Sequence, residues 1–214
     1  MTRRVTGARR KPGTRARSAQ RGRPAQHGGT GQLGQVRLIG GRWRGRRLAV
    51  VQAPGLRPSP DRLRETVFNW LAPRLPGAHC LDLFAGSGAL GLEAASRGAA
   101  SVTLVERHPH AAACLRASIE QLEAGEQVSL IEAEALSALQ GLDRRWDIVF
   151  IDPPFADGGQ AAVLQALLPD RLGADARVHV ESGAGDTAPL ADGFEVLRDK
   201  RFGDARARLL TPLD

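Results

Sequence analysis

The strongest constraint on the fold of this chain is a repeated change of hydrophobic period that begins at Cys80. Short apolar runs predict strands near Cys80–Phe84, Ser101–Val105, Gln127–Ile131, Trp146–Ile151 and Arg177–Glu181. Stretches with a helical period alternate with them near Ala89–Arg97, Pro109–Glu123, Leu136–Gly141 and Gln160–Leu168. This alternation is typical of an α/β fold with a mainly parallel sheet. Phe194–Arg201 and Arg206–Leu210 predict an antiparallel hairpin at the C-terminal end.

The first 60 residues differ in charge from the rest, because they hold 15 of the 30 Lys and Arg residues and none of the 23 acidic residues. Residues 1–35 contain few large apolar side chains, which predicts a disordered Arg-rich arm. Such an arm suits a polyanion such as RNA, and a solvated tail fits the same composition equally well.

Two elements are expected between this arm and the α/β region. Val36–Val51 predicts two strands around an Arg-rich turn. Pro60–Leu71 predicts a helix whose apolar face consists of Leu63, Val67, Phe68 and Leu71. We therefore expect an arm over 1–35, a hairpin and helix over 36–72, and a main domain over 73–214.

The composition also bears on the compartment and on metals. No window approaches the run of about 18 apolar residues that crosses a membrane, and no apolar segment follows Arg3-Arg4 as an export signal requires. Cys80 and Cys114 lie too far apart for a CxxC motif. We expect a cytoplasmic protein that needs neither a membrane nor a metal.

A glycine-rich segment follows the first predicted strand of the main domain. Gly86, Gly88 and Gly91 satisfy the pattern GxGxxG, and Glu106 lies at the end of the next strand, where an acid can hold ribose hydroxyls. Both NAD and S-adenosylmethionine fit this pattern. Asp82 favours S-adenosylmethionine, because its carboxylate would lie beside a cationic group rather than an anionic pyrophosphate. The structural alternative is an acid that binds N–H groups of the loop.

A second motif, Asp152-Pro153-Pro154-Phe155, ends the predicted strand Trp146–Ile151. The two prolines lack N–H groups, so the Asp152 carboxylate and the Pro153 carbonyl remain as acceptors. Two acceptors can hold the hydrogens of an exocyclic amine and direct the nitrogen lone pair at a methyl donor. Phe155 would stack on the base, a contact worth roughly 1–3 kcal/mol. The alternative is a structural turn with Phe155 in the core.

These motifs resemble those of class I methyltransferases that act on exocyclic amines. More closely, residues 37–45, 57–71 and 180–182 resemble the bacterial 16S ribosomal RNA guanine-N2 methyltransferases of the RsmD type. The resemblance implies a Rossmann-like sheet and methyl transfer from S-adenosylmethionine to the N2 amine of a guanine in the assembling small subunit. We expect the protein to be a monomer.

The resemblance also implies roles for individual residues. The cofactor would contact Asp82, Phe84, Gly86, Gly88 and Glu106, and the guanine would lie against Asp152, Pro153, Pro154 and Phe155. The position near adenine, often Asp or Asn in this family, is Glu134 here. RNA would contact the basic residues of the hairpin and its Trp, namely Arg37, Arg42, Trp43, Arg44, Arg46, Arg47 and Arg57. A solvated hairpin with Trp43 covering the edge of the core is the alternative.

Three other functions are compatible with parts of the sequence. Adenine N6 in DNA or RNA is the nearest, because the motif at 152–155 serves that amine too. A noncatalytic ribosome-assembly factor would bind RNA through its arm and use the Rossmann-like body as a scaffold, although Asp82, Gly86, Gly88 and Asp152 would then have no chemical purpose. An NAD oxidoreductase fits the glycine pattern and is disfavoured by the same two carboxylates.

Overall fold

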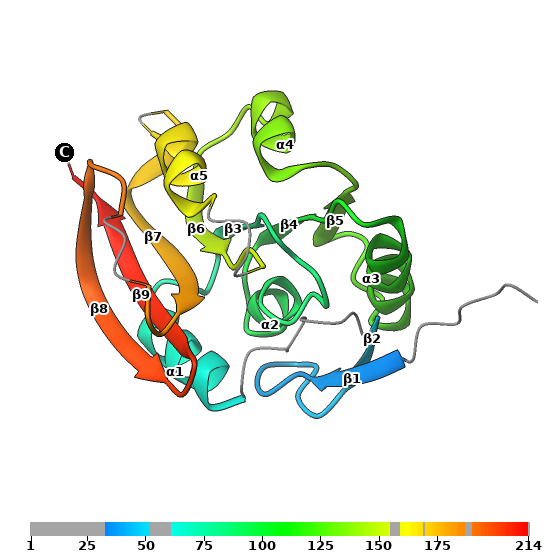
Figure 1. The fold of residues 1–214 in the computed structure, drawn as a ribbon. Helices are drawn as coiled ribbons and strands as arrows, with labels where there is room; N and C mark the ends of the chain where they lie inside the picture. The colour runs from blue at the N-terminus through cyan, green and yellow to red at the C-terminus, as the bar shows by residue number, and fades with distance from the viewer. Residues whose placement is uncertain (1–32, 52–60, 155–158, 169, 187–189, 214) are drawn as a thin grey trace, which may run out of the picture. The chain divides into compact units, whose positions relative to one another are not determined.

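Seven strands form one sheet in the order β5-β4-β3-β6-β7-β9-β8 (Figure 1). The strands are β3 (His79–Asp82), β4 (Ser101–Val105), β5 (Val128–Ile131), β6 (Trp146–Ile151), β7 (Leu172–Gly183), β8 (Phe194–Phe202) and β9 (Ala205–Pro212). The first five strands in that order are parallel, whereas β9 is antiparallel to both β7 and β8. The predicted fold class, including the antiparallel C-terminal hairpin, is confirmed.

This computed structural model describes residues 33–51, 61–154, 159–168, 170–186 and 190–213. Four predicted features lie outside the described residues. They are the arm as far as residue 32, Arg57 in the RNA-contacting set, Pro60 at the start of the predicted helix, and Phe155 in the amine-binding motif.

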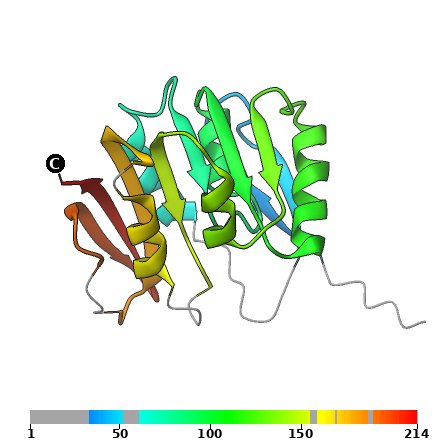
Figure 2. The same ribbon diagram turned by 90° about the horizontal axis from the view of Figure 1, so that it is seen from above.

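Helices cover both faces of the sheet (Figure 2). Helices α1 (Asp61–Leu71), α2 (Gly91–Ser96) and α3 (Pro109–Gln121) contribute to one apolar cluster with Cys80, Leu104 and Phe150. Helices α4 (Ala135–Gly141) and α5 (Gln160–Leu167) contribute to a second cluster, with Val149 and Val180. The two clusters use alternate residues of β6, because neighbouring side chains in a strand point to opposite faces.

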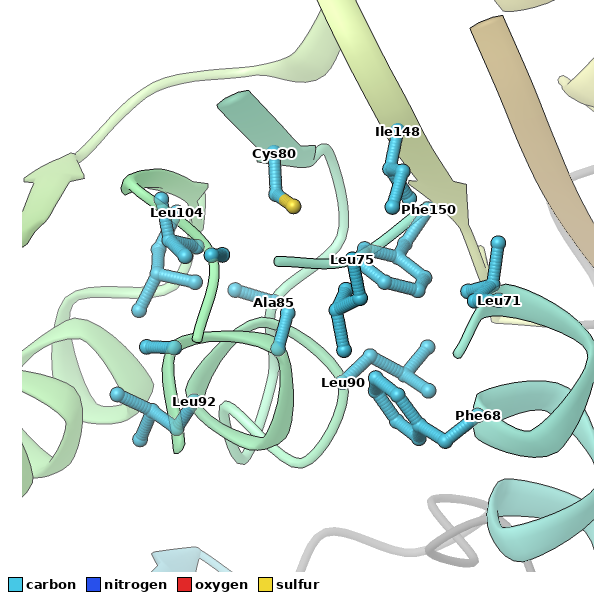
Figure 3. Close-up of a cluster of buried hydrophobic side chains, with 14 of the residues drawn as sticks. Phe68, Leu71, Leu75, Cys80, Ala85, Leu90, Leu92, Leu104, Ile148 and Phe150 are labelled. Atoms are coloured by element: carbon cyan, nitrogen blue, oxygen red, sulfur yellow. The ribbon is translucent and has the colours of Figure 1, made fainter. Parts of the chain in front are cut away.

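Helix α1 binds the sheet through the face that its period predicts. Leu63, Val67, Phe68 and Leu71 are each 0% exposed. The Phe68 ring lies 5.9 Å from that of Phe150 in β6 (Figure 3). Full burial of one such side chain contributes roughly 1.5–3 kcal/mol, so this short helix depends on the sheet for its stability.

The predicted N-terminal hairpin consists of β1 (Leu33–Arg37) and β2 (Arg47–Val51), which pair with Arg37 opposite Arg47. Strand β1 begins inside the segment that the sequence assigned to a disordered arm, so the boundary at residue 35 was wrong by three residues. Residues 33–35 are ordered because each pairs with a residue of β2, a constraint that composition does not reveal.

Strand boundaries in the sheet also differ from the expectation, by five residues at the start of β7 and by one or two residues elsewhere. Strand β7 begins at Leu172 instead of Arg177, because Leu172 already pairs with Trp146 before a register shift. Strand β3 ends at Asp82, and Leu83 and Phe84 form a turn. Asp82 is therefore the last residue of its strand, at the edge where the following loop begins.

Candidate active site

The predicted site residues meet at the carboxyl ends of three adjacent parallel strands. Asp82 ends β3, between Leu104 of β4 and Phe150 of β6 in the sheet register. Glu106 directly follows β4, and Asp152 directly follows β6. From β3 the chain continues to β4 and β5 on one side of the sheet, and from β6 it continues to β7 on the other side. In open α/β sheets, ligands bind in the crevice where the strand order changes direction in this way.

The carboxyl group of Asp82 is buried, and one of its two oxygens accepts a hydrogen bond. It is 2% exposed, and its Oδ2 accepts a hydrogen bond from the Gly91 N–H over 2.9 Å. Its Oδ1 has no hydrogen-bond partner among the described residues. Burial raises the pKa of Asp82 to about 7, and the negative charge of nearby Asp152 adds to this effect, while the Gly91 N–H opposes it. A cationic ligand group would favour the charged form.

The two glycines of the loop, Gly86 and Gly88, differ in what surrounds them. Gly86 has a φ of 51°, and a Cβ built on it would meet only the Phe84 carbonyl oxygen, at 3.8 Å. Gly88 has a φ of 76°, and its Cβ would lie 2.7 Å from both Leu92 and Leu115. The Cβ position of Gly86 is therefore open, whereas the absence of a Cβ at Gly88 makes room for core side chains. Contact of either glycine with the cofactor stays a prediction.

Glu106 holds the loop from the neighbouring strand. It is 7% exposed, its Oε2 accepts from the Gly86 N–H over 2.8 Å, and its Oε1 accepts from the His108 N–H over 2.7 Å. Each carboxylate oxygen has a second lone pair, so both can still accept from hydroxyl groups. Glu106 thus combines the loop-binding role that the sequence considered for Asp82 with the capacity to bind ribose.

The other predicted cofactor residues lie at the margin of this group. Phe84 is half-buried in the turn after β3. Glu134 is exposed, immediately before α4, and its Oε1 lies 3.1 Å from Arg107 Nη1. Because β5 is separated from β3 by β4, Glu134 is two strands away from Asp82.

The Asp-Pro-Pro turn leaves the sheet next to Asp82. Asp152 is half-buried, Pro153 is buried and Pro154 is exposed. Asp152 is close enough for its charge to act on the pKa of Asp82. The turn therefore brings a carboxylate and a carbonyl without a competing prolyl N–H to the same edge as the glycine loop.

The hairpin presents its arginines to solvent and its tryptophan to the core. All five described arginines of the predicted RNA-contacting set, Arg37, Arg42, Arg44, Arg46 and Arg47, are exposed. Trp43 is 8% exposed, belongs to the larger core cluster and is covered by the Arg42 guanidinium, 4.1 Å from its ring centre. The predicted contact of Trp43 with RNA is therefore corrected, because its side chain is buried and covers the core as in the alternative.

Sequence reasoning missed the residues that hold this hairpin in place, Glu93 and Ser96 of α2. Glu93 is 0% exposed and accepts from the N–H groups of Ile39 and Gly40, each over 2.7 Å. Ser96 Oγ accepts from the Trp43 N–H over 3.0 Å. The available signal was a single acid in an otherwise small and apolar helix, which must find donors when it is buried.

The described residues also bear on membranes and metals. No helix among them is long and apolar enough to cross a membrane. In the same part of the chain, no group of three or more His, Cys, Asp or Glu side chains could hold a metal ion. Cys80 and Cys114 are both free thiols.

The sheet order, the glycine loop and the Asp-Pro-Pro turn together define a Rossmann-like methyltransferase. The chain belongs to the family described as "Conserved hypothetical protein 95", which matches residues 36–211. It is 44% identical over 179 residues to "Ribosomal RNA small subunit methyltransferase D" of Escherichia coli (strain K12), an alignment that covers 82% of this chain and 89% of that protein.

Two further comparisons agree. The protein of the same name from Haemophilus influenzae is 37% identical over 180 residues, which cover 82% of this chain and 93% of that one. The solved structure "Putative methyltransferase yhhF from Escherichia coli" superposes with a TM-score of 0.77 at 40% identity, covering 84% of this chain and 98% of that chain.

Proposed function

We propose that this protein transfers a methyl group from S-adenosylmethionine to the exocyclic N2 amine of a guanine in 16S ribosomal RNA. The observation that carries the proposal is the juxtaposition of two carboxyl groups with different surroundings at adjacent strand ends. Asp82 is buried beside the glycine loop, and Asp152 is half-buried in a proline turn. Asp82 suits a cationic cofactor and Asp152 suits an amine substrate.

The residues present fit the proposed cofactor. The unpartnered Oδ1 of Asp82 offers an acceptor to the amino group of the cofactor, and the open backbone at Gly86 allows close approach. Glu106 would hold the ribose hydroxyls, while Phe84 and Glu134 would border the adenosine. When bound, S-adenosylmethionine supplies an electrophilic methyl group.

The proposed chemistry depends mainly on positioning. An aryl amine is a weak nucleophile because its lone pair is delocalised into the ring. The Asp152 carboxylate and the Pro153 carbonyl would each accept one N–H of that amine, which directs the lone pair at the methyl group. Asp152 can then accept the proton that the nitrogen loses. Holding reactants in this geometry can supply about 7–11 kcal/mol of the barrier reduction.

The exposed arginines of the hairpin support an RNA substrate. Arg44 and Arg46 in the turn, and Arg37 and Arg47 at its base, would neutralise phosphates while the target base enters the site. The names of the relatives from Escherichia coli and Haemophilus influenzae, both small subunit methyltransferases, favour ribosomal RNA. We infer that the substrate is the assembling small subunit in the cytoplasm and that the protein acts as a monomer.

Transfer of labelled methyl to small ribosomal subunits from cells that lack this protein tests the proposal. Nucleoside analysis should place the label in N2-methylguanosine of 16S RNA. Label in N6-methyladenosine would keep the site assignment and overturn the base. Binding of subunits without methyl transfer, under conditions where S-adenosylmethionine also binds, would favour a noncatalytic assembly factor.

A further inference from the structure

Helix α2 touches the proposed cofactor site at one end and the basic hairpin along its other end. Its first residue, Gly91, donates its N–H to Asp82. Two residues later, the Glu93 carboxylate accepts from two backbone N–H groups of the hairpin turn and also from Arg97 Nε, each over 2.7 Å. Six residues therefore connect the two surfaces that the reaction would use.

The end of α2 holds the hairpin turn with several further bonds. Ser96 Oγ donates to the Gly40 carbonyl over 2.6 Å and accepts from the Trp43 N–H over 3.0 Å. The Ser96 carbonyl accepts from the Arg42 N–H over 2.8 Å. The turn thus binds α2 through both backbone and side-chain groups.

The fit between turn and helix leaves no room for adjustment. A Cβ on Gly41, whose φ is 73°, would lie 1.9 Å from the Ser96 carbonyl oxygen. A Cβ on Gly40 would lie 2.6 Å from the Arg97 guanidinium. Because the two backbones are in direct contact, a shift of α2 must move the turn and the arginines on it.

A helix of six residues is not stable on its own, since nucleation costs more than so few hydrogen bonds return. Its order depends on the burial of Leu92, Ala94 and Ala95 in the core, and its two ends are fixed by Asp82 at the start and by the hairpin turn at the end. A ligand that fixes either end lowers the entropy cost of binding at the other, even without a large structural change.

We propose that α2 couples the cofactor site to the RNA-binding hairpin, with Glu93 as the positioning residue, so that cofactor and RNA bind cooperatively. This inference rests on the cofactor and the RNA surface of the proposed function. Linkage makes the coupling reciprocal, so RNA increases the affinity for the cofactor by the same factor.

Hydrogen exchange of the intact protein tests the coupling without any RNA. Saturating S-adenosylhomocysteine, the product form of the cofactor, should slow exchange at the Ile39 and Gly40 amides on the order of fivefold or more. In Glu93→Gln, an amide group faces one of these N–H donors, and the slowing should fall below about twofold. Ser96→Ala removes two other bonds of the same contact and should act in the same direction.

Glu195→Gln is the matched control, because it removes an exposed acid from β8, the edge strand of the seven-stranded sheet, to which the hairpin does not belong. It should retain the full wild-type slowing. In the same variants, S-adenosylhomocysteine should tighten RNA binding on the order of fivefold or more for wild type and Glu195→Gln, and below about twofold for Glu93→Gln and Ser96→Ala.

Unchanged exchange in the wild-type turn at saturating ligand overturns the coupling, as does equal slowing in wild type and Ser96→Ala. If Glu93→Gln fails to fold, Ser96→Ala alone decides. Slowed exchange together with absent methyl transfer would refute the proposed function and leave the coupling intact. Absence of calorimetric binding of S-adenosylhomocysteine would overturn both the proposed cofactor and the coupling.

Discussion

Asp82 accepts a hydrogen bond from the Gly91 N–H over 2.9 Å, which joins the end of β3 to the first residue of α2. A Cβ on Gly91 would lie 2.2 Å from the Leu104 side chain and 3.2 Å from Asp82 Oδ2, so this contact requires glycine. Asp82 therefore has two tasks, since it accepts from α2 in the fold and would face a cation in the proposed reaction.

The raised pKa of Asp82 predicts that stability falls as the pH rises from about 4 to about 7. In this interval the folded protein keeps a proton on Asp82 that the unfolded chain has released. The free energy of unfolding therefore decreases as the pH rises. Asp82→Asn keeps an acceptor oxygen for the Gly91 N–H, and its amide group does not ionise.

The free energy of unfolding of Asp82→Asn should increase relative to that of the wild type as the pH rises. This change should reach up to about 4 kcal/mol and level off above about pH 7. Urea unfolding of both proteins from about pH 5 to about pH 8 measures the difference. If the difference between the two proteins does not change with pH, the pKa of Asp82 is not raised in the folded protein.

The same ionisation should control cofactor affinity. The charged form of Asp82 attracts the cationic cofactor, so the Kd for S-adenosylmethionine should decrease by up to about tenfold per pH unit below about pH 7 and flatten above it. Calorimetry across this range gives the profile. In Asp82→Asn the affinity should be weaker and the slope should disappear; a wild-type slope retained in this variant would assign the titration to another group.

Asp152→Asn should reduce kcat roughly a hundredfold or more, because its amide keeps an acceptor for the amine but cannot accept the proton that the nitrogen loses. Its effect on the cofactor should have the opposite sign. Since the charge of Asp152 raises the pKa of Asp82, removing it favours ionised Asp82 and should tighten S-adenosylmethionine binding near neutral pH. Single-turnover kinetics and calorimetry on the same preparation separate the two effects. Equal kcat in variant and wild type would refute the role of Asp152.

The double variant Arg44→Gln/Arg46→Gln should weaken RNA binding and reduce its dependence on salt. A plot of the logarithm of the binding constant against the logarithm of the salt concentration has a negative slope. Each lost phosphate contact reduces the magnitude of this slope by about 0.7–0.9. Binding measured at four or five salt concentrations gives the slope, and the Kd for S-adenosylmethionine in the absence of RNA serves as the control. An unchanged slope would show that these two exposed arginines do not contact phosphate.

Gly41 and Gly45 form a matched pair for stability. Both have positive φ, 73° and 85°, but a Cβ on Gly45 meets nothing within 4 Å, whereas one on Gly41 meets Ser96. Gly45→Ala should cost about 1–2 kcal/mol from backbone conformation alone. Gly41→Ala should cost a further ~1–3 kcal/mol because the turn must move away from α2. Urea unfolding of the two variants compares them; equal losses would mean that the turn is not bound tightly to α2.

Several features of this protein could be predicted from the sequence because they depend on local patterns. The period of α1 identified all four of its buried apolar residues, and the apolar run Trp146–Ile151 gave the bounds of β6. Asp152 directly follows its predicted strand, Asp82 lies within two residues of the predicted end of its own, and parallel strands bring their carboxyl ends to one edge. The meeting of these two residues therefore followed from the fold class.

Other features were decided by contacts between residues far apart in the chain. The residues at 33–35 are ordered by pairing with β2, and Trp43 is buried in the core cluster, where its N–H binds Ser96 of α2. Glu93 lies more than 50 positions from the N–H groups that it binds. No local pattern links such partners, because burial and hydrogen bonding depend on which surfaces the folded chain brings together. The sequence alone thus determined the fold class and the carboxyl groups of the site, whereas the tertiary structure decided how the hairpin is fixed to the helix that follows the glycine loop.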